Sequence, residues 1–487
     1  MLTLTLLVFG LWVISDVSST SHRIFRILFY VVLLGLLVGI FLAPIPISQQ
    51  FLHLGFSSFF LAVTGFLLTL AKGKIKFQGS LLLIICILAF FRPKSMGDSS
   101  IQNALIPNPE GEWLIQTTPE NVLKISQILK DKQAVIRRAF FPKDAENTEL
   151  DDYYVIDIPK GSKLSDLKTL IPADLIIWEE VNELIPMEFP QKNEAPLRGN
   201  TSIANDTWVA SQWHLGHLDM KNYYEYFAAN NLVPLRKAKL YILDTGIDQR
   251  HEDLPLGGTK FSADKQGHGT HCAGVAAAIT NNNLGVASMS PSPDWVELHG
   301  IQVIRDIGFG SQEDIIDGII QASDEGADVI SLSLGGITNQ TREKAYNDAI
   351  EYANRKGAII VVAAGNANLD GKRYSPANSK NVITVTSVDA TGKKSGFSNH
   401  VANIEMGIAA PGEKIFSTTP SNKYEALSGT SMAAPQVAGL ISVMKSMRPD
   451  LDTKRAFQLL STSGLDSDNT SRTGKIIQPS AAIKLLK

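Results

Sequence analysis

The stretch AIIVVAAGN (358–366) decides how the C-terminal part of this 487-residue chain folds. It is a continuous apolar run, without the alternation of a half-exposed strand, and it ends in Gly365 and Asn366. Such runs are typical of parallel strands that are buried on both faces. Polar residues that directly follow a parallel strand lie at the edge of the sheet where α/β proteins bind their ligands.

Similar apolar stretches recur on both sides of this one. They are KLYILD (239–244), HGIQVI (299–304), DVISLSL (328–334) and VITVTSV (382–388). Helical patterns separate several of them, notably over 312–325 and 341–356. Apolar strands that alternate with helices predict a doubly wound, mostly parallel α/β sheet that is covered on both faces. We therefore expect one α/β domain over residues 208–487.

The first 95 residues have a different composition. No Asp, Glu, Lys or Arg occurs between positions 27 and 71. Four apolar runs stand in this region, at 2–14, 27–47, 51–71 and 77–91. The second and third have the roughly 20 residues that cross a bilayer, whereas the first and fourth are short. Residues 1–95 are therefore predicted to form a multi-pass membrane region, with up to four transmembrane helices in contact with lipid.

Charges in the connecting loops set the expected orientation of this region. Lys and Arg gather in 16–26 and 72–76, and positive loops stay on the cytoplasmic side. With four spans, the chain after residue 95 is extracytoplasmic; if the fourth run does not cross, the orientation reverses. The first run could instead belong to a signal sequence, although no Lys or Arg precedes it and no small-residue cleavage pattern follows it.

The charge and the cysteines of the whole chain limit its function further. A formal net charge of −3 argues against a nucleic-acid partner, because nucleic-acid binding requires a basic excess. Cys86 lies in an apolar run and Cys272 in the α/β domain, so we expect no disulfide between them.

A small domain is predicted over residues 110–185. The strand patterns EWLIQT, QAVIRRAFF, DYYVIDI and DLIIWEE alternate with helical patterns over 119–131 and 164–170, in the order βαββαβ. This order is the split βαβ arrangement of α+β ferredoxin-like domains. Residues 186–207 are rich in Pro, Asn and charge, which is typical of an exposed linker that proteases cut.

Three local motifs contain residues whose side chains could take part in catalysis. ILDTGID places Asp244 at a strand end, GHGTHCAG places His268 before a helix of small residues, and SGTSMAAPQ places Ser431 before another. Pro435 lacks a backbone N–H and is tolerated only in the first turn of a helix. The helix that contains Pro435 must therefore begin near Ser431. Ser431 then lies at the positive end of the helix dipole, where negative charge on a substrate is stabilised.

Asp, His and Ser supply the three parts of a nucleophilic catalyst. Asp244 would orient the imidazole, and His268 would take the proton of Ser431 and return it to the leaving amine. The side-chain amide of Asn366 would donate to the oxyanion. Each residue alone also has a plainer interpretation: Ser431 as a helix N-cap and Asp244 as a turn residue. His268 and His271 have the spacing of a metal pair, but no acidic third ligand is near them in the sequence.

The motifs resemble those of the subtilisin-like serine proteases, or subtilases. DTGI, HGTHCAG, SLGG, AAGN and GTSMAAP all occur in the order of that family, over roughly residues 211–481. The form with Cys272 is similar to the proteinase K branch, in which this cysteine is a free thiol beside the active site. Gln436 stands where the family commonly has His. The resemblance implies a serine endopeptidase that hydrolyses polypeptide substrates through an acyl-enzyme, with no cofactor required for the chemistry.

The same resemblance assigns binding residues. Two segments would sandwich an extended substrate by backbone pairing, and small residues would form the pocket for the side chain before the scissile bond. They are Gly308, Phe309, Gly310, Ser333, Leu334 and Gly335 for the segments, and Ala364, Gly365 and 375–377 for the pocket. NNNLGVA (281–287) resembles the calcium loop of several subtilisins, with Asp253 and Asn282 as ligands of a structural calcium. An ordinary Asn-rich turn is the alternative.

The small domain resembles, more loosely, the inhibitory propeptide of this family, whose last strand lies in the active-site cleft. It would then be an intramolecular inhibitor, and self-cleavage between about 186 and 205 would release the peptidase domain from the membrane region. Two other functions stay open. One is a catalytically inactive, membrane-tethered pseudoprotease that binds peptides in its cleft. The other is a transporter-like role for the N-terminal spans, which is poorly supported because His53 is the one candidate for a buried charge there.

Overall fold

The computed structural model describes residues 112–159, 162–182, 184–187, 190–194, 203–255, 263–338 and 343–486. These residues belong to a compact unit that begins at Pro107. The four apolar runs that are predicted to enter a membrane lie outside the described residues. Within the described ranges, no helix is both long and apolar enough to span a bilayer.

The small domain has the predicted order of elements. They are β1 (Glu112–Gln116), α6 (Pro119–Leu129), β2 (Val135–Arg138), β3 (Tyr153–Asp157), α7 (Leu164–Lys168) and β4 (Trp178–Val181). The strands form an antiparallel sheet in the order β2–β3–β1–β4. The last strand is shorter than predicted, because Ala173–Leu175 forms a turn of 3-10 helix and β4 begins only at Trp178. One face of the sheet packs on the two helices through residues that include Trp113, Ile125 and Leu167.

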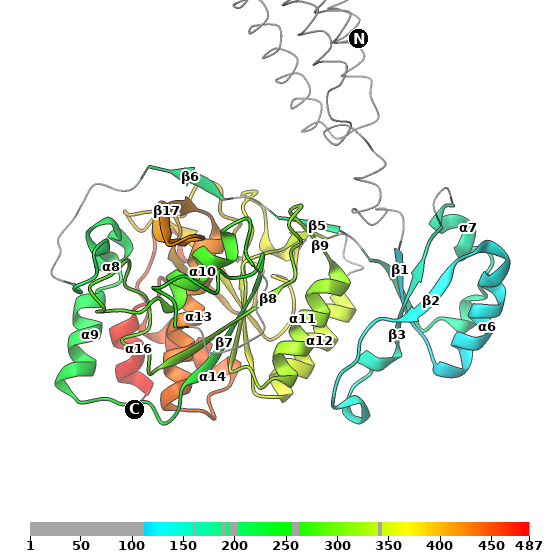
Figure 1. Ribbon diagram of the computed structural model, residues 1–487, viewed down its shortest axis with the longest axis horizontal. Helices are drawn as coiled ribbons and strands as arrows, with labels where there is room; N and C mark the ends of the chain where they lie inside the picture. Colours follow the sequence, from blue (N-terminus) through cyan, green and yellow to red (C-terminus); the bar gives the residue numbers. More distant parts are fainter. Residues whose placement is uncertain are drawn as a thin grey trace, which may run out of the picture. The chain divides into compact units, whose positions relative to one another are not determined.

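The large domain is built on the predicted parallel sheet (Figure 1). Its strands are β7 (Ala238–Asp244), β8 (Val296–Gln302), β10 (Val329–Leu332), β12 (Ile359–Ala363), β14 (Val382–Val388) and β15 (Gly407–Pro411). They lie in the order β15–β14–β12–β10–β7–β8, and every neighbouring pair is parallel. The strand of the AIIVVAAGN stretch, β12, is buried along its whole length. The fold predicted from that stretch is therefore confirmed.

Helices cover both faces of this sheet and enclose two separate cores. One face carries α9 (Met220–Ala229), α10 (His268–Ala277), α13 (Thr430–Met447), α14 (Thr453–Ser463) and α16 (Pro479–Leu486), and the other carries α11 (Gln312–Asp324) and α12 (Glu343–Arg355). The short helices α8 (Trp213–His217) and α15 (Thr470–Thr473) and the strands β11 (Gly336–Ile337) and β13 (Tyr374–Ser375) complete the domain.

Helices α10 and α13 approach each other unusually closely. A Cβ atom added at Gly439 of α13 would lie 2.4 Å from the carbonyl oxygen of Ala276 in α10, so only glycine fits there. Nearly every residue of α13 is buried. The small residues predicted for these two helices therefore serve their contact.

Two short strands precede the large domain in the chain and pair with its edges. Strand β5 (Leu184–Pro186) pairs antiparallel with β9 (Phe309–Ser311), and β6 (Gln191–Asn193) pairs antiparallel with β17 (Lys423–Ser428). Strand β17 also pairs with β16 (Ile415–Thr419). Met187, which follows β5, is only 7% exposed. Within the stretch predicted to be an exposed linker, Pro186, Gln191 and Lys192 are exposed and Met187 is buried, so the linker assignment stays a prediction.

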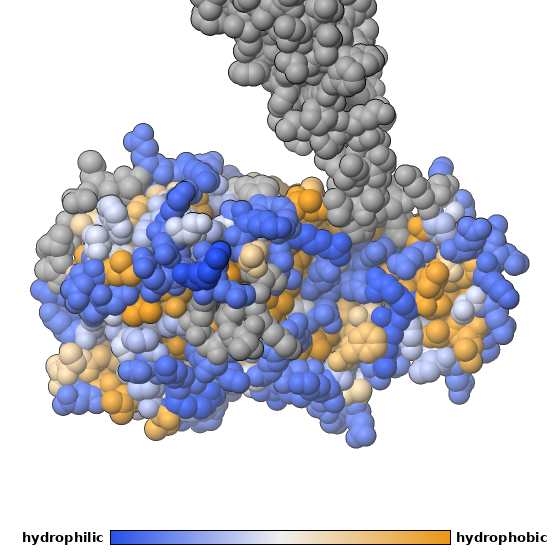
Figure 2. Space-filling view, viewed as in Figure 1, coloured by the Kyte–Doolittle hydropathy of each residue, from blue (hydrophilic) through white to orange (hydrophobic). Residues whose placement is uncertain are grey.

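The face seen in Figure 2 is mostly hydrophilic, and apolar side chains gather on it over the small domain. The exposed large apolar residues of that domain include Leu123, Val135, Phe141 and Ile177.

Candidate active site

The predicted site residues meet at the carboxyl edge of the parallel sheet. Asp244 is the last residue of β7, Ser333 follows β10, and Asn366 lies three residues beyond the end of β12. Since these three strands are neighbours in the sheet, residues more than a hundred positions apart reach one edge. The helices α10 and α13 begin at the same edge, with His268 and Ser431 in their first turns.

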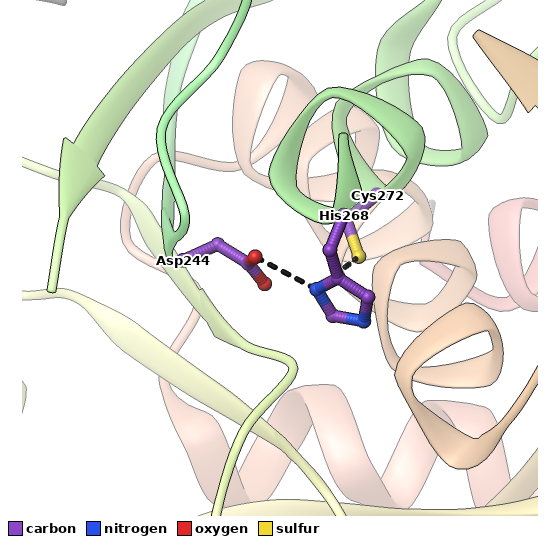
Figure 3. A group of neighbouring side chains, drawn as sticks. All are labelled: Asp244, His268 and Cys272. Carbon is purple, nitrogen blue, oxygen red and sulfur yellow. Dashed lines mark hydrogen bonds and ion pairs between the residues drawn. The ribbon is translucent and has the colours of Figure 1, made fainter. Parts of the chain in front are cut away.

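Asp244 and His268 form a buried contact. Asp244 Oδ1 lies 2.7 Å from His268 Nδ1, and the two side chains are 1% and 3% exposed (Figure 3). The backbone N–H of Thr245 donates to the same carboxylate oxygen. Burial lowers the pKa of His268, but Asp244 and Cys272 together raise it by more, so this pKa lies well above its usual range. This contact is the aspartate–imidazole pair that the sequence predicts.

Cys272 lies one helical turn after His268 and touches both helices of the site. Its Sγ is 4.0 Å from His268 Nδ1 and 3.3 Å from the carbonyl oxygen of Ser431. The thiol is free and buried, and burial raises its pKa, so it is protonated at neutral pH. Ligand atoms of Asp244, His268 and Cys272 lie within 4.8 Å of one another, which is compatible with a metal ion. The Asp244–His268 hydrogen bond already uses two of these atoms.

The alternative metal pair of His268 and His271 is not formed. His271 Nε2 lies 3.0 Å from the carbonyl oxygen of Ile415 and 3.1 Å from that of Glu425, in the core beneath β16 and β17. Burial lowers the pKa of His271 to about 3, so this ring is neutral and structural.

Ser431 lies in the first turn of α13, as the sequence predicts. Pro435 is the sixth residue of the helix and lies inside it, so the prediction that this proline belongs to the first turn is wrong. Helix α13 begins at Thr430, and Gly429 precedes it in an extended conformation. The Ser431 hydroxyl donates to the carbonyl oxygen of Ser333 at 3.0 Å, and the Ser333 hydroxyl donates to the carbonyl oxygen of Ser431 at 2.9 Å. His268 Nε2 is buried and has no hydrogen-bond partner among the described residues. The nucleophile and the base thus share one site, but the hydrogen bond between them is not made in this structure.

Asn366 is oriented by the residue before Ser431. Its Oδ1 accepts hydrogen bonds from the Thr430 backbone N–H at 2.8 Å and from the Thr430 hydroxyl at 2.9 Å. The oxygen edge of the amide therefore turns toward α13, and its NH₂ group is the donor on the other edge. A residue that sequence reasoning missed, Asn399, supports this loop by donating to the Ala364 carbonyl and accepting from the Leu369 N–H. No local pattern identifies Asn399, because its partners are about 30 residues away.

One of the two segments that are predicted to bind substrate is paired with strand β5 of the same chain. Residues 308–310 pair with β5, in the register Ile185↔Gly310 and Pro186↔Phe309, and the Met187 N–H donates to the Gly308 carbonyl at 2.9 Å. A Cβ at Gly310 would lie 2.3 Å from the Val303 carbonyl oxygen, so glycine is required at this edge.

The second segment and the predicted pocket adjoin the serine. Ser333 contacts Ser431 directly, and the backbone of Gly335 approaches that of Ser375 closely, because an added Cβ would lie 3.0 Å from the Ser375 carbonyl oxygen. Leu334 is 7% exposed and Ala364 is fully buried. Gly365 has a φ of +96°, and a Cβ there would press against the Tyr374 ring.

The predicted calcium loop gathers two buried carboxylates. Asp253 accepts from Asn282 Nδ2 and from the Val286 N–H, each at 2.9 Å, while Asp206 accepts from the N–H groups of Asn281 and Asn282. Burial raises the pKa of Asp253 to about 7, with Asp206 adding to the shift, and burial also raises the pKa of Asp206. Sequence reasoning missed Asp206, which lies 47 positions before Asp253.

This donor set fits a hard cation. Both carboxylates are destabilised in their charged form by burial, and oxygen ligands are the ones that calcium prefers. A Cβ at Gly285 would lie 2.0 Å from Asp253 Oδ2, so the loop closes tightly on this carboxylate. Asn282 here turns its NH₂ group toward Asp253 and its Oδ1 toward the Leu284 N–H. It would have to turn to become a ligand.

Comparisons with known proteins agree with these features. The sequence profile of the Subtilase family (Peptidase_S8) matches residues 236–474. The chain is 40% identical over 228 residues to thermitase of Thermoactinomyces vulgaris, which covers 45% of this chain and 78% of that protein. It is 36% identical over 247 residues to subtilisin DY of Bacillus licheniformis, which covers 49% of this chain and 87% of that protein.

A solved structure is similar over a larger part of the chain. It is described as proteases from Pseudoalteromonas arctica, and it matches with a TM-score of 0.50 and 29% sequence identity. The match covers 59% of this chain and 100% of that one. None of these comparisons supports the inactive peptide-binding alternative.

Proposed function

Because this chain belongs to the subtilase family of serine endopeptidases, we propose that it cleaves polypeptides with Asp244, His268 and Ser431 as its catalytic triad. Ser431 Oγ attacks the scissile carbonyl, His268 takes the proton at Nε2 and returns it to the leaving amine, and Asp244 holds the ring in the productive tautomer. The observation that carries this proposal is the buried 2.7 Å contact between Asp244 Oδ1 and His268 Nδ1. It engages Nδ1 and leaves Nε2 to act as the base.

Formation of the Ser431–His268 hydrogen bond accompanies substrate binding. The serine hydroxyl now uses the carbonyl oxygen of Ser333 as its acceptor. A substrate N–H that pairs with this carbonyl competes for it, and rotation about χ1 then turns the hydroxyl toward His268. Catalytic hydrogen bonds commonly tighten only in the complex with substrate, so the present geometry is that of a resting site.

The oxyanion is stabilised by two donors of different kinds. The Asn366 side chain, oriented through Thr430, supplies its NH₂ group. The N–H of Ser431 belongs to the first turn of α13, where backbone donors lack intrahelical partners and the helix dipole favours negative charge. Both are fixed before reaction, which is what makes such donors effective.

The small domain acts as an intramolecular inhibitor. It contacts α11 of the peptidase domain through Arg137 to Glu313, Glu180 to Gln312, and Asn182 to the Glu313 N–H. Its sheet shares a hydrophobic core with the peptidase domain through Leu114, Tyr153 and Val155, among others. Strand β5 continues from this domain onto the edge where a substrate would pair.

Self-cleavage falls within a short interval of the chain. Strand β5 is bound on one side of the site and β6 on the other, so the bonds between Met187 and Pro190 are the ones that lie between the two bound strands. Residues 188 and 189 themselves lie outside the described ranges. Cleavage there separates the small domain from the peptidase domain.

Mass spectrometry of the expressed chain tests this proposal. Wild type should yield a peptidase fragment that begins at residue 188, 189 or 190, whereas Ser431→Ala should stay intact. Ser471→Ala, which removes an exposed serine hydroxyl, is the matched control and should process normally. A serine-directed fluorophosphonate should label wild type and not Ser431→Ala. An intact wild type that is labelled would refute self-cleavage alone, and a processed wild type that is not labelled would refute the catalytic role of Ser431.

The N-terminal region anchors the enzyme in a membrane with the peptidase domain outside the cytoplasm, until processing releases it. The apolar, charge-free runs of the sequence support this assignment. Protease added to sealed vesicles tests the orientation: digestion of the peptidase domain from the extracytoplasmic side alone is expected, and its protection on that side would refute the assignment.

Calcium, when bound, neutralises the two buried carboxylates of Asp206 and Asp253 and so stabilises the loop over 281–287. Asp206 and Asp253 would hold the ion, which would have no part in the peptide-bond chemistry.

A further inference from the structure

We propose that Glu425 on β17 selects a basic side chain in the part of a substrate that follows the scissile bond. This inference rests on the endopeptidase function proposed above. It adds a preference at a position remote from the reacting bond.

The chain itself shows how this edge receives a strand. Strand β6 pairs antiparallel with β17 in the register Gln191↔Ser428, Lys192↔Leu427 and Asn193↔Ala426. The pairing is backbone strand addition, which accepts many sequences in the added strand. Strand β17 ends two residues before α13 begins, so the same edge leads directly to Ser431.

This edge is continuous with the catalytic histidine. A cavity of about 290 Å³ is lined by His268 and Gly267 together with Glu425 and Leu427 of β17, and Pro190 and Lys192 border it from the other strand. Upstream of the candidate cleavage bonds the chain is held on β9, and downstream it is held on β17. A polypeptide that threads through the site therefore meets β17 with its downstream residues.

Side chains on the added strand make two specific contacts. Lys192 Nζ lies 2.8 Å from Glu425 Oε2, and Asn193 Nδ2 donates to Ser428 Oγ at 2.7 Å. Ser428 Oγ also accepts from the Lys414 N–H, so this hydroxyl is held in place. Lys192 is the third to fifth residue after the cleaved bond, depending on which bond between Met187 and Pro190 is cut.

Besides Lys192, two lysines border the same cavity as Glu425. Lys423 lies two positions earlier on β17 and borders the cavity, and Lys265 borders it too but forms an ion pair with Asp306. Lys192 is 77% exposed and Glu425 is 39% exposed, so solvent screens their attraction. An exposed pair of this kind changes an equilibrium by roughly two- to fivefold, and the preference should be of that size.

The test uses a set of peptides and a charge reversal. Three fluorogenic peptides carry residues 184–195 of this chain with Lys, Gln or Glu at position 192. They are assayed with the expressed full chain in its wild-type form and with Glu425→Lys. Glu405→Lys changes the net charge equally at an exposed position outside β17, and is the control. Mass spectrometry of the products verifies that all peptides are cut at the same bond.

Glu425→Lys is expected to reverse the order in which the Lys and Glu peptides are preferred. Wild type and Glu405→Lys should cleave the Lys peptide with a kcat/KM about two- to fivefold above that of the Glu peptide, and Glu425→Lys should invert this order. The preference should shrink at 1 M salt, because screening weakens exposed pairs. Cleavage of all peptides at equal rates, or with the same order in both Glu425 forms, would overturn this inference and leave the endopeptidase function standing. Failure to cleave any peptide, by chains from which the small domain has been removed, would refute the endopeptidase function itself.

Discussion

Asp253 makes the stability of the calcium-free enzyme depend on pH in an unusual direction. Burial raises the pKa of this carboxyl group from an ordinary 3.8 to about 7. Between these values the folded chain keeps a proton that the unfolded chain has lost, so the free energy of unfolding falls as the pH rises. A shift of about three units, at about 1.36 kcal/mol per unit, corresponds to roughly 4 kcal/mol lost between pH 4 and pH 7. Asp206 shifts in the same direction and adds to the loss.

Scanning calorimetry between pH 4 and pH 8 measures this effect. The Ser431→Ala chain should be used, because it does not digest itself. In a chelator, its melting temperature should fall with rising pH relative to the same chain with Asp253→Asn, which has no titrating group at this position. Saturating calcium should restore stability at pH 8 and do little at pH 4, because a metal ligand must be deprotonated. The test is the difference between the two chains in how steeply the melting temperature changes with pH. A loss of stability that Asp253→Asn causes equally at every pH does not affect this difference.

Parallel pH profiles of the two chains in chelator would refute the pKa assignment. An equal gain from calcium in both chains would show that the ion binds elsewhere.

Three further predictions concern the catalytic residues and their support. Asp244→Asn should lower kcat/KM by about 10⁴, and should move the ascending limb of the pH–rate profile to lower pH, because the carboxylate contributes to the raised pKa of His268; an unmoved limb would contradict this cause. Asn366→Ala should lower kcat by about 10²–10³ with little change in KM, and stopped-flow or steady-state assays that show a KM effect alone would argue against an oxyanion role. Gly439→Ala should lower the free energy of unfolding by about 1–3 kcal/mol, because its Cβ would meet the Ala276 carbonyl oxygen; unchanged chemical denaturation would refute the close contact.

Most of the fold could be predicted from the sequence because its signals are local. The buried strand β12 is a continuous apolar run, and the start of α13 is marked by Pro435 within its first two turns. The order of the small domain was equally readable, although DLIIWEE overstated its last strand. There Pro172 precedes a turn of 3-10 helix that uses up the first residues of the apolar pattern.

The remaining features depend on partners far away in the chain. Strands β5 and β6 carry prolines and charges that suggest a loop, and become strands only because β9 and β17 offer open edges more than a hundred residues later. Asp206 joins the loop over 281–287 from outside its motif for the same reason. The order Asp, His, Ser predicted which residues share the site. The rotamer of Ser431, however, depends on a competing acceptor, the backbone carbonyl of Ser333, and the SLGG motif that contains Ser333 does not reveal this hydrogen bond.

The glycine contact between α10 and α13 has a mechanical consequence. His268 and Ser431 are therefore carried by two helices whose backbones touch. Helix α10 is packed just as closely on the turn after β7, because a Cβ at Gly269 would lie 2.1 Å from the Gly246 carbonyl oxygen. The three catalytic side chains thus belong to elements in direct backbone contact, and heating should separate them in one step, together with the sheet, and not one at a time.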